Sequence, residues 1–393
     1  MAVIDRGGPF GAPAPALSSR RARFEASPAR NLDPVLIGAV IAIALLGLLM
    51  IYSSTRERLA FDGIDELYFV KRQAVFILLG LCAMAAVMAV DYRKLRDFSV
   101  LAYGAAVISL LAVLSPLGSD ARGAQAWFQL PGGFQLQPSE LAKFAIIVAV
   151  AGYCNEHRGE MDPRQLALTI GLAAVPLGLV ALQPDLGTGM VIALIVVGLL
   201  ALAGVSGRQL AILGLLALTG VWAVINLGML AEYQQDRLTA VFDSGSDPEG
   251  SGYTQEQSEL AIQTGSIDGK GLYQGPQTQG GFVPEQHTDF IFTAAGEELG
   301  FIGAGTLLAL FAVVVWRVWR TATQARDFYG MLVCMGVLAM LTFQIFENIG
   351  MTMGIMPVTG IPLPFMSYGG SSTLTTFACI GLVSNVYMRR FIG

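Results

Sequence analysis

Ten long apolar stretches, separated by shorter polar segments, run along the chain. Each can cross a hydrocarbon core about 30 Å thick as an α-helix rising about 1.5 Å per residue. The first is longer than the apolar part of a signal peptide, so we expect it to remain as a span. The sequence predicts an all-α polytopic membrane protein with ten transmembrane helices, at 34–53, 74–90, 98–114, 138–154, 166–182, 188–204, 209–229, 290–316, 329–350 and 367–388.

The amino-acid composition limits which partners and which catalytic groups the chain can use. Of 393 residues, 54% are hydrophobic and 13% charged, and the net charge of −5 gives no reason to expect a nucleic-acid partner. The 46 glycines suit closely packed membrane helices. Four cysteines without a CxxC pair and two histidines do not favour disulfide, zinc or histidine-triad chemistry. Catalysis should therefore rely on carboxylates.

The distribution of Lys and Arg predicts the orientation. Sixteen of the 24 lie on one side of the ten spans and seven on the other, with Lys143 inside a span. The positive-inside rule makes the sixteen-charge side cytoplasmic, so both termini lie inside. Residues 1–31 read as a disordered basic tail, and 32–393 as the transmembrane domain. The long loop 231–289, between helices seven and eight, lies outside and contains a predicted short helix at 253–262.

The end of this outer loop contains the leading catalytic candidate, Asp289. It lies in Pro284-Glu-Gln-His-Thr-Asp-Phe-Ile-Phe, just before the eighth span. Thr288 or Asp289 could simply cap that helix. A carboxylate at such a rim can also reach a lipid-borne substrate, and partial desolvation suits it to act as a general base.

Two further carboxylates, Glu297 and Glu298, follow in the same span. They should lie about 12–13 Å deeper than Asp289, so they cannot share one substrate atom with it. We expect them to hydrogen-bond or pack against neighbouring helices, and leave them out of the catalytic set.

The fourth span begins with Gln137-Pro-Ser-Glu-Leu-Ala-Lys. Glu140 and Lys143 share one helical face and should pair. The pair could fix helix register, or Lys143 could meet an anionic head group from the outer leaflet. Before this span, Arg122 supplies a cation and Trp127 an interfacial aromatic side chain, although an aromatic belt alone would explain the tryptophan.

Two more segments on the outer side carry candidate binding residues. Asp185 lies in Gln183-Pro-Asp-Leu-Gly-Thr-Gly between spans five and six, where an ordinary turn is the alternative interpretation. Residues 354–372 contain three prolines and cannot form a continuous helix. Irregular backbone at membrane depth should border a cavity. Ser371, Ser372 and nearby amides could bind phosphate oxygens there.

Together these motifs resemble the SEDS family of RodA and FtsW proteins, from about residue 32 to the C-terminus, and the last motif is most similar to RodA. The motifs are QPSELAK, QPDLGTG, PEQHTDFIF with GEELGF, and MPVTGIPLPFMSYGGSS. One position departs from many relatives, which have a basic residue where Ala126 precedes the tryptophan; Arg122 could substitute for it.

The resemblance implies a peptidoglycan glycosyltransferase that polymerises lipid II on the outer face of the bacterial cytoplasmic membrane. It implies a class B penicillin-binding protein, a transpeptidase, as partner within the cell-elongation machinery. Asp289 matches the family's essential aspartate. Glu140, Lys143 and Asp185 match its other important polar positions, and His287, in the same motif as Asp289, joins the substrate-binding candidates.

The implied reaction suits these residues, because one in-line displacement with inversion needs a base but no acid. We expect Asp289 to be that base, and Lys143, Arg122 or a divalent cation such as Mg²⁺ or Mn²⁺ to neutralise the pyrophosphate. No organic cofactor is expected. A lipid II flippase or other transporter remains an alternative, because buried ionisable residues and broken helices also mark substrate pathways. A third alternative is a scaffold that only recruits or activates a transpeptidase.

Overall fold

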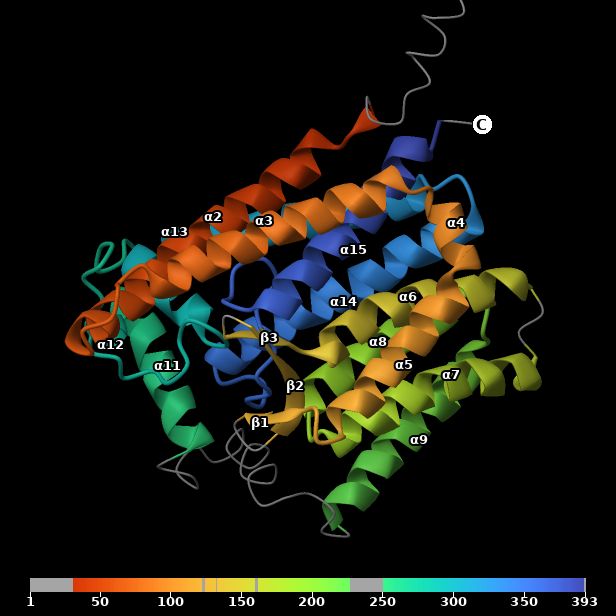
Figure 1. The fold of residues 1–393 in the computed structure, drawn as a ribbon, viewed down its shortest axis with the longest axis horizontal. Coiled ribbons are helices and arrows are strands. Elements are labelled where there is room, and N and C mark those ends of the chain that lie inside the picture. The colour runs from red at the N-terminus through yellow and green to blue at the C-terminus, as the bar shows by residue number, and fades with distance from the viewer. Residues whose placement is uncertain (1–30, 122–123, 132, 160–161, 227–249, 392–393) are drawn as a thin grey trace, which may run out of the picture.

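The computed structural model describes residues 31–121, 124–131, 133–159, 162–226 and 250–391, and shows a bundle of long helices (Figure 1). The predicted basic tail therefore lies outside the described residues, apart from Asn31. A helix occupies each of the ten predicted ranges: α2 (Pro34–Phe61), α3 (Tyr68–Ala89), α5 (Ser99–Val113), α6 (Pro138–Glu156), α7 (Pro163–Leu182), α8 (Leu186–Leu202), α9 (Gly207–Asn226), α13 (Ile291–Thr323), α14 (Phe328–Thr352) and α15 (Gly370–Arg389).

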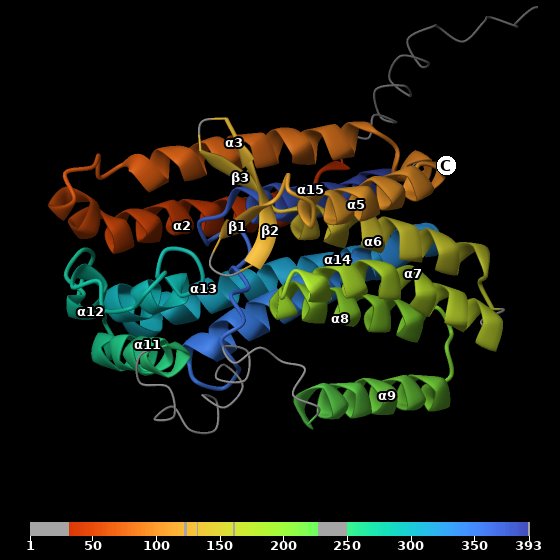
Figure 2. The ribbon, with the colours of Figure 1, turned by 60° about the horizontal axis from the view of Figure 1, so that its bottom comes forward.

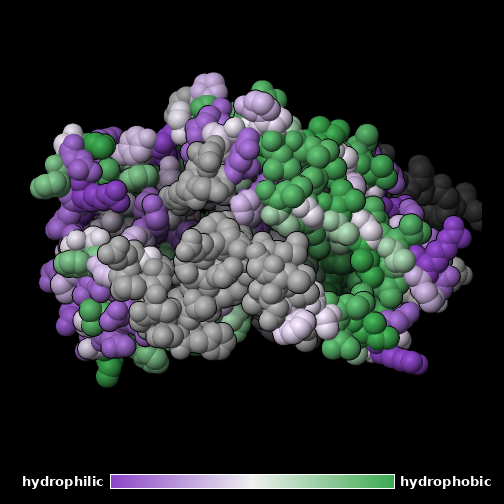
Figure 3. Space-filling model, turned by 90° about the horizontal axis from the view of Figure 1, so that it is seen from below, coloured by the Kyte–Doolittle hydropathy of each residue, from purple (hydrophilic) through white to green (hydrophobic). Residues whose placement is uncertain are grey.

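Five of these helices, α2, α3, α7, α13 and α14, are long and apolar enough to cross a membrane by length and composition. The surface fits that environment. Figure 3 shows apolar side chains gathered over the helices to the right of the grey residues, and polar side chains gathered toward the two ends of the molecule. The chain is therefore a multi-pass membrane protein, while ten crossings stay a prediction.

The two ends of the bundle differ in what they contain. The start of α2, the short helix α4 (Tyr92–Asp97) and the end of α15 lie together at one end, and the short helix α12 (Pro276–Gln279) lies at the other (Figure 1). The core between them includes nearly all of α6, α14 and α15, whose inward positions are buried aliphatic side chains. Buried polar residues are costly unless they are hydrogen-bonded, so the polar residues inside this core point to the candidate functional site.

One element corrects the all-α prediction. A three-stranded antiparallel sheet follows α5: β1 (Ser119–Ala121), β2 (Ala124–Leu130) and β3 (Phe134–Leu136), in the order β1-β2-β3. Gly133, with φ of 71°, turns the chain between β2 and β3. Figure 2 shows this sheet crossing the bundle beside α3 and α15. The sheet contacts α5, α6 and α15 and lies largely at the surface: Gln129, Leu130 and Gln135 are exposed, whereas Ala126 is buried.

The predicted outer loop contains the expected helix, α11 (Ser251–Gly265), while residues 227–249 lie outside the described part of the chain. α11 packs near the bend in α13 at Gly300, where φ is 64°. A Cβ at Gly300 would lie 2.2 Å from the nitrogen of Gly269, so only glycine permits this approach. The contact fixes the loop on the bundle.

Candidate functional site

The broken segment 353–369 joins α14 to α15, and the prediction that it is no continuous helix is confirmed. The side chains of Gln73 in α3 and of Ser367 within the segment bind its backbone. The Gln73 amide donates to the carbonyl of Ser367 at 3.1 Å and accepts from the Gly369 nitrogen at 3.2 Å. The Ser367 hydroxyl accepts from the Leu363 nitrogen at 2.8 Å. An irregular segment can therefore remain inside the bundle with its polar groups bound.

Asp289 lies immediately before α13, in a turn whose backbone is fixed on both sides. Its nitrogen donates to the Glu285 carbonyl at 3.1 Å, and Glu285 itself has φ of 51°. The buried Asn348 of α14 donates one amide nitrogen to the carbonyl of Asp289, at 2.7 Å, and to that of Ile361, at 2.8 Å. Asn348 thus bridges Asp289 to the broken segment.

The carboxylate of Asp289 faces the same segment. A Cβ built on Gly360, where φ is 74°, would lie 3.4 Å from Asp289 Oδ2. The alternative interpretation is that Thr288 or Asp289 caps α13, but Phe290 occupies the N-cap position and its side chain makes no capping hydrogen bond. The Thr288 hydroxyl instead donates to the Glu285 carbonyl at 3.0 Å, within the turn. The N-cap position of α13 therefore lies one residue after Asp289.

Asp185 joins two helices to this region. One carboxylate oxygen accepts from the Thr188 nitrogen at 2.9 Å, which caps α8. The other accepts from the Gln137 amide at 3.0 Å and from the Ser139 hydroxyl at 3.3 Å, both at the start of α6. Gly187, the second residue of α8, packs so closely on residues 359–361 that a Cβ would lie 2.8 Å from the Ile361 side chain. Asp185 is thus more than an ordinary turn residue.

Glu140 and Lys143 form the predicted pair in α6, with a 2.7 Å bond between Oε1 and Nζ. Lys143 is 1% exposed and the second oxygen of Glu140 has no partner among the described residues. The same end of α6 meets α15, because the Gln137 nitrogen donates to the Ser371 hydroxyl at 2.8 Å. Ser371 and Ser372 are both buried. Contact of these groups with a substrate stays a prediction.

A cavity of about 590 Å³ adjoins this network, as predicted for the broken segment. It lies among the end of α2, the start of α3, the sheet, the turn 281–288 and residues 368–370, and Trp127 and His287 line it. Among the described residues, the lining does not include Asp289, Asp185, Glu140 or Lys143. Arg122 lies outside the described residues. The cavity and the polar network are therefore neighbours that share the ends of the broken segment.

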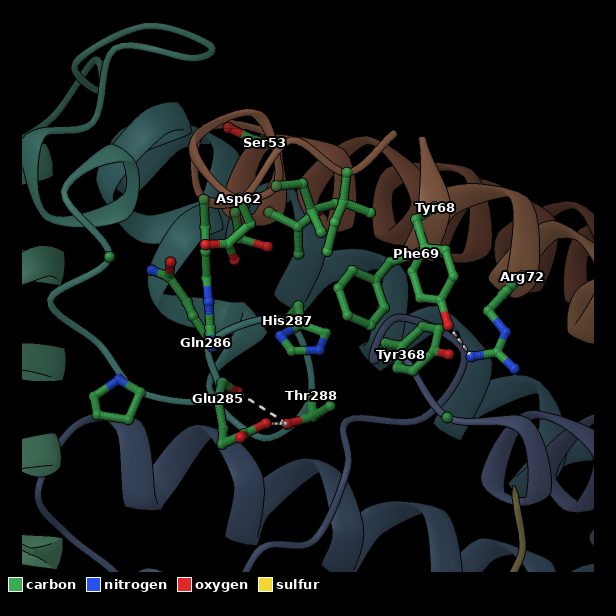
Figure 4. A pocket seen from close by; sticks show the side chains of 18 of the residues that line it. Ser53, Asp62, Tyr68, Phe69, Arg72, Glu285, Gln286, His287, Thr288 and Tyr368 are labelled. Carbon is green, nitrogen blue, oxygen red and sulfur yellow. Dashed lines mark hydrogen bonds between the residues drawn. The ribbon is translucent and has the colours of Figure 1, made fainter. Parts of the chain in front are cut away.

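One wall of the cavity is aromatic and cationic (Figure 4). The His287 ring lies 4.6 Å from that of Phe69 and 5.6 Å from that of Tyr368, and the His287 carbonyl accepts from the Tyr368 nitrogen at 3.0 Å. Beyond them, Arg72 donates to the Tyr68 hydroxyl at 2.6 Å. The wall offers a positive charge beside flat apolar rings.

Arg72 and Arg58, which both line the cavity, were not among the sequence candidates. The sequence contains a usable signal, because Lys71 and Arg72 stand at the mouth of an apolar span on the side with few cations. Lys71 is engaged elsewhere: its hydrogen bond to Asp65 lowers the pKa of that carboxyl. Arg72, and not Lys71, is therefore the cation that lines the cavity together with His287.

Glu297 and Glu298 behave as predicted, by bonding to neighbours. Glu297 accepts from the nitrogens of Gln277 and Thr278, both at 2.8 Å, and from the Thr278 hydroxyl at 2.6 Å. Glu298 accepts from the Ser53 hydroxyl at 2.6 Å and the Gln279 amide at 3.0 Å. They attach α12 and α2 to α13, which is a structural role.

Comparison with known proteins agrees with this arrangement. A family model described as "Cell cycle protein", named for FtsW, RodA and SpoVE, matches residues 34–391. The probable peptidoglycan glycosyltransferase FtsW of Geobacter metallireducens is 36% identical over 91% of this chain and 95% of its own length. The peptidoglycan glycosyltransferase MrdB of Escherichia coli K12 is 34% identical over 92% of this chain and 94% of its own length.

A solved structure described as "Structural coordination of polymerization and crosslinking by a peptidoglycan synthase complex" is also similar. Its TM-score is 0.76 at 32% identity, covering 92% of this chain and 99% of that one. The bundle and its broken segment thus define a polytopic membrane enzyme of the glycosyltransferase class. Within that class, the chain belongs to the SEDS family of FtsW, RodA and SpoVE proteins.

Proposed function

We propose that the chain polymerises lipid II into peptidoglycan glycan strands during cell elongation, with Asp289 as the general base. The glycosyltransferase names of its relatives support the reaction class. The observation that carries the proposal is the place of Asp289: its backbone is bridged by Asn348 to the broken segment, and its carboxylate faces Gly360. A base must be held in one position relative to its substrate.

In the proposed step, Asp289 takes the proton from the acceptor GlcNAc 4-hydroxyl as that oxygen attacks the MurNAc anomeric carbon. The new β-1,4 bond forms as the bond from that carbon to the pyrophosphate oxygen breaks. Undecaprenyl pyrophosphate leaves with the bonding electrons, and the configuration inverts. A sugar leaving group needs an acid, whereas a pyrophosphate is already a stable anion, so one carboxylate suffices.

Positive charge would assist departure of the pyrophosphate. Arg72 lies on the cavity wall, and the start of α15, at Gly369 and Gly370, opens on the same cavity. Lys143 is buried against Glu140, so it acts on the substrate through this pair or after a rearrangement of the pair. A divalent cation is part of the proposal. No group of three His, Cys, Asp or Glu is placed to hold one in the described part of the chain, so substrate oxygens would supply most ligands.

The site is proposed to face outside the bacterial cytoplasmic membrane. The start of α2 and the end of α15 lie at the opposite end of the bundle, the end with the larger share of Lys and Arg (Figure 1). That charge bias favours a cytoplasmic position for both termini. The proposed partner is a class B penicillin-binding protein in the elongation machinery. The similarity to a solved complex that couples polymerisation to crosslinking supports this.

The test is polymerisation by the purified full-length chain, with lipid II as the only substrate and no other glycosyltransferase. We expect glycan polymer, with one undecaprenyl pyrophosphate released for each glycosidic bond formed. EDTA should abolish this activity, and addition of Mg²⁺ or Mn²⁺ should restore it. Vesicles containing labelled lipid II separate the alternatives. If labelled lipid II crosses the bilayer and no polymer forms, the chain is a flippase. If there is neither transport nor polymer but the chain still binds a transpeptidase, it is a scaffold.

A further inference from the structure

Two consecutive residues of α14 hold the broken segment on either side of Gly360. Asn348 donates to the carbonyl of Ile361, the residue after Gly360, at 2.8 Å. Glu347 accepts from the hydroxyl of Thr359, the residue before it, at 2.6 Å. The turn of the segment at Gly360, where φ is 74°, is therefore fixed from one point of one helix.

The stability of the bundle does not account for a carboxylate at position 347. Glu347 is 0% exposed in an otherwise apolar stretch of α14, and its Oε2 has no hydrogen-bond partner among the described residues. Glu297 differs, because donors bind both of its oxygens. A buried carboxylate that is only partly satisfied costs free energy that an apolar side chain of similar size would not. Ionisable residues at membrane depth more often serve a function.

Thr359 is also confined from the opposite side, by α8. A Cβ built on Gly187 would lie 3.0 Å from the Thr359 carbonyl oxygen and 3.4 Å from the Thr359 Cβ. The backbone of Thr359 thus meets α8 while its hydroxyl binds α14. Glu347 supplies the second of these two restraints, and together they set the place of Gly360.

We infer that Glu347 is a positioning residue for glycosyl transfer: through Thr359 it holds Gly360 beside the carboxylate of Asp289. The inference rests on the proposed role of Asp289 as general base. A Cβ on Gly360 would lie 3.4 Å from Asp289 Oδ2, so movement of this turn changes the surroundings of the base directly. Glu347 is not among the described residues that line the cavity, and it therefore acts through the segment and not on the substrate.

The first test is kinetic, on the purified full-length chain with lipid II. Glu347→Leu and Thr359→Val each remove the hydrogen bond, and each should lower kcat about tenfold with KM within about twofold of the wild type. Glu347→Gln and Thr359→Ser keep an acceptor and a donor, and should retain at least about half of the wild-type kcat. The double variant Glu347→Leu/Thr359→Val should be within about twofold of the slower single variant, because both changes remove the same bond.

A second measurement needs no enzymatic activity. Hydrogen exchange, read by mass spectrometry on a peptide spanning 353–361, should be about tenfold faster at residues 358–361 in Glu347→Leu and in Thr359→Val, since each change makes local opening easier. Gln344→Leu is the matched control, because it removes another buried polar side chain from α14, and its exchange should stay within about twofold of the wild type. Thr359 is half-buried and outside the helices, so its valine variant should fold even if Glu347→Leu does not.

The outcomes separate this inference from the proposed function. Wild-type exchange and wild-type kcat in Thr359→Val would overturn the role of Glu347 while polymerisation by the wild type stands. Losses that multiply in the double variant would also overturn it, because the two side chains would then act independently. A wild-type chain that makes no polymer would contradict the proposed function, and the exchange rates would still show whether Glu347 holds the segment.

Discussion

Asp289 and Glu297 stand eight residues apart and meet very different surroundings. Glu297 is 0% exposed, and nitrogens and a hydroxyl from α12 bind both of its oxygens. Asp289 is half-buried, Asn348 and Glu285 bind its backbone, and its carboxylate faces Gly360. A carboxylate whose oxygens are all used holds a fold together. The backbone contacts of Asp289 instead fix where its carboxylate lies, beside the broken segment, and a general base must be held in one position.

The largest effect should come from Asp289→Asn. The amide cannot accept the acceptor proton, so the rate of glycan formation from lipid II should fall about 10²–10⁴-fold. Thermal stability should stay near that of the wild type, because asparagine has nearly the shape of aspartate and Phe290 holds the N-cap position of α13. Asp268→Asn, an exposed acidic position in the same outer loop, is the matched control and should polymerise normally. Wild-type rates in Asp289→Asn would remove it as the base.

A smaller loss is expected for Asn348→Ala. This change removes the bridge between the carbonyls of Asp289 and Ile361, so kcat should fall about tenfold to hundredfold with little change in KM. The control is Gln344→Leu, one turn away in α14, whose buried amide has no hydrogen-bond partner among the described residues. That substitution should be nearly neutral. Equal kinetic losses in the two variants would show that Asn348 does not position the site.

Gly360→Ala should reduce activity by about fivefold. The new methyl would lie 3.4 Å from Asp289 Oδ2. The alanine would also have to adopt φ of 74°, a conformation that costs it about 1–2 kcal/mol. Gly63→Ala separates the two causes, since φ there is 69° and nothing lies within 4 Å. It should lose similar stability and keep its rate. An equal loss of rate at both positions would mean that backbone strain, and not contact with Asp289, lowers activity.

The smallest effect on rate is expected for Glu297→Gln. The amide replaces an acceptor oxygen with a donor opposite backbone N–H groups, so the free energy of unfolding should fall by about 1–3 kcal/mol. Activity per folded molecule should remain within about twofold of the wild type. Glu256→Gln, exposed on α11, is the stability control. A large loss of turnover in well-folded Glu297→Gln would erase the distinction between the two carboxylates.

Local pattern was enough to predict much of this fold. Apolar run length placed a helix in each of ten ranges, and Pro138 begins α6 as a proline at the first helical position should. Three prolines correctly predicted the break at 353–369. The Glu140–Lys143 pair follows from helical spacing alone. In each case the determining interactions lie within a few residues of the chain.

The failures involve contacts that the hydrophobic pattern does not encode. Thr288 looks like a cap, but Glu285 at positive φ makes a separate turn that uses its hydroxyl. The sheet of β1, β2 and β3 depends on the pairing of its strands and on contacts with α5, α6 and α15, which the apolar pattern does not encode. Asn348 appears in sequence as one polar residue in an apolar helix, and its role depends on two carbonyls 59 and 13 residues away. No periodicity encodes such pairings.

The most direct test compares lipid II affinity and polymerisation in the same preparation of Asp289→Asn. If the carboxylate is the proton acceptor, the variant should bind lipid II within about threefold of the wild type while glycan formation falls at least about 100-fold. Polymer at the wild-type rate would contradict this account. So would a loss of rate that matches an equal loss of lipid II affinity, because Asp289 would then act in binding alone.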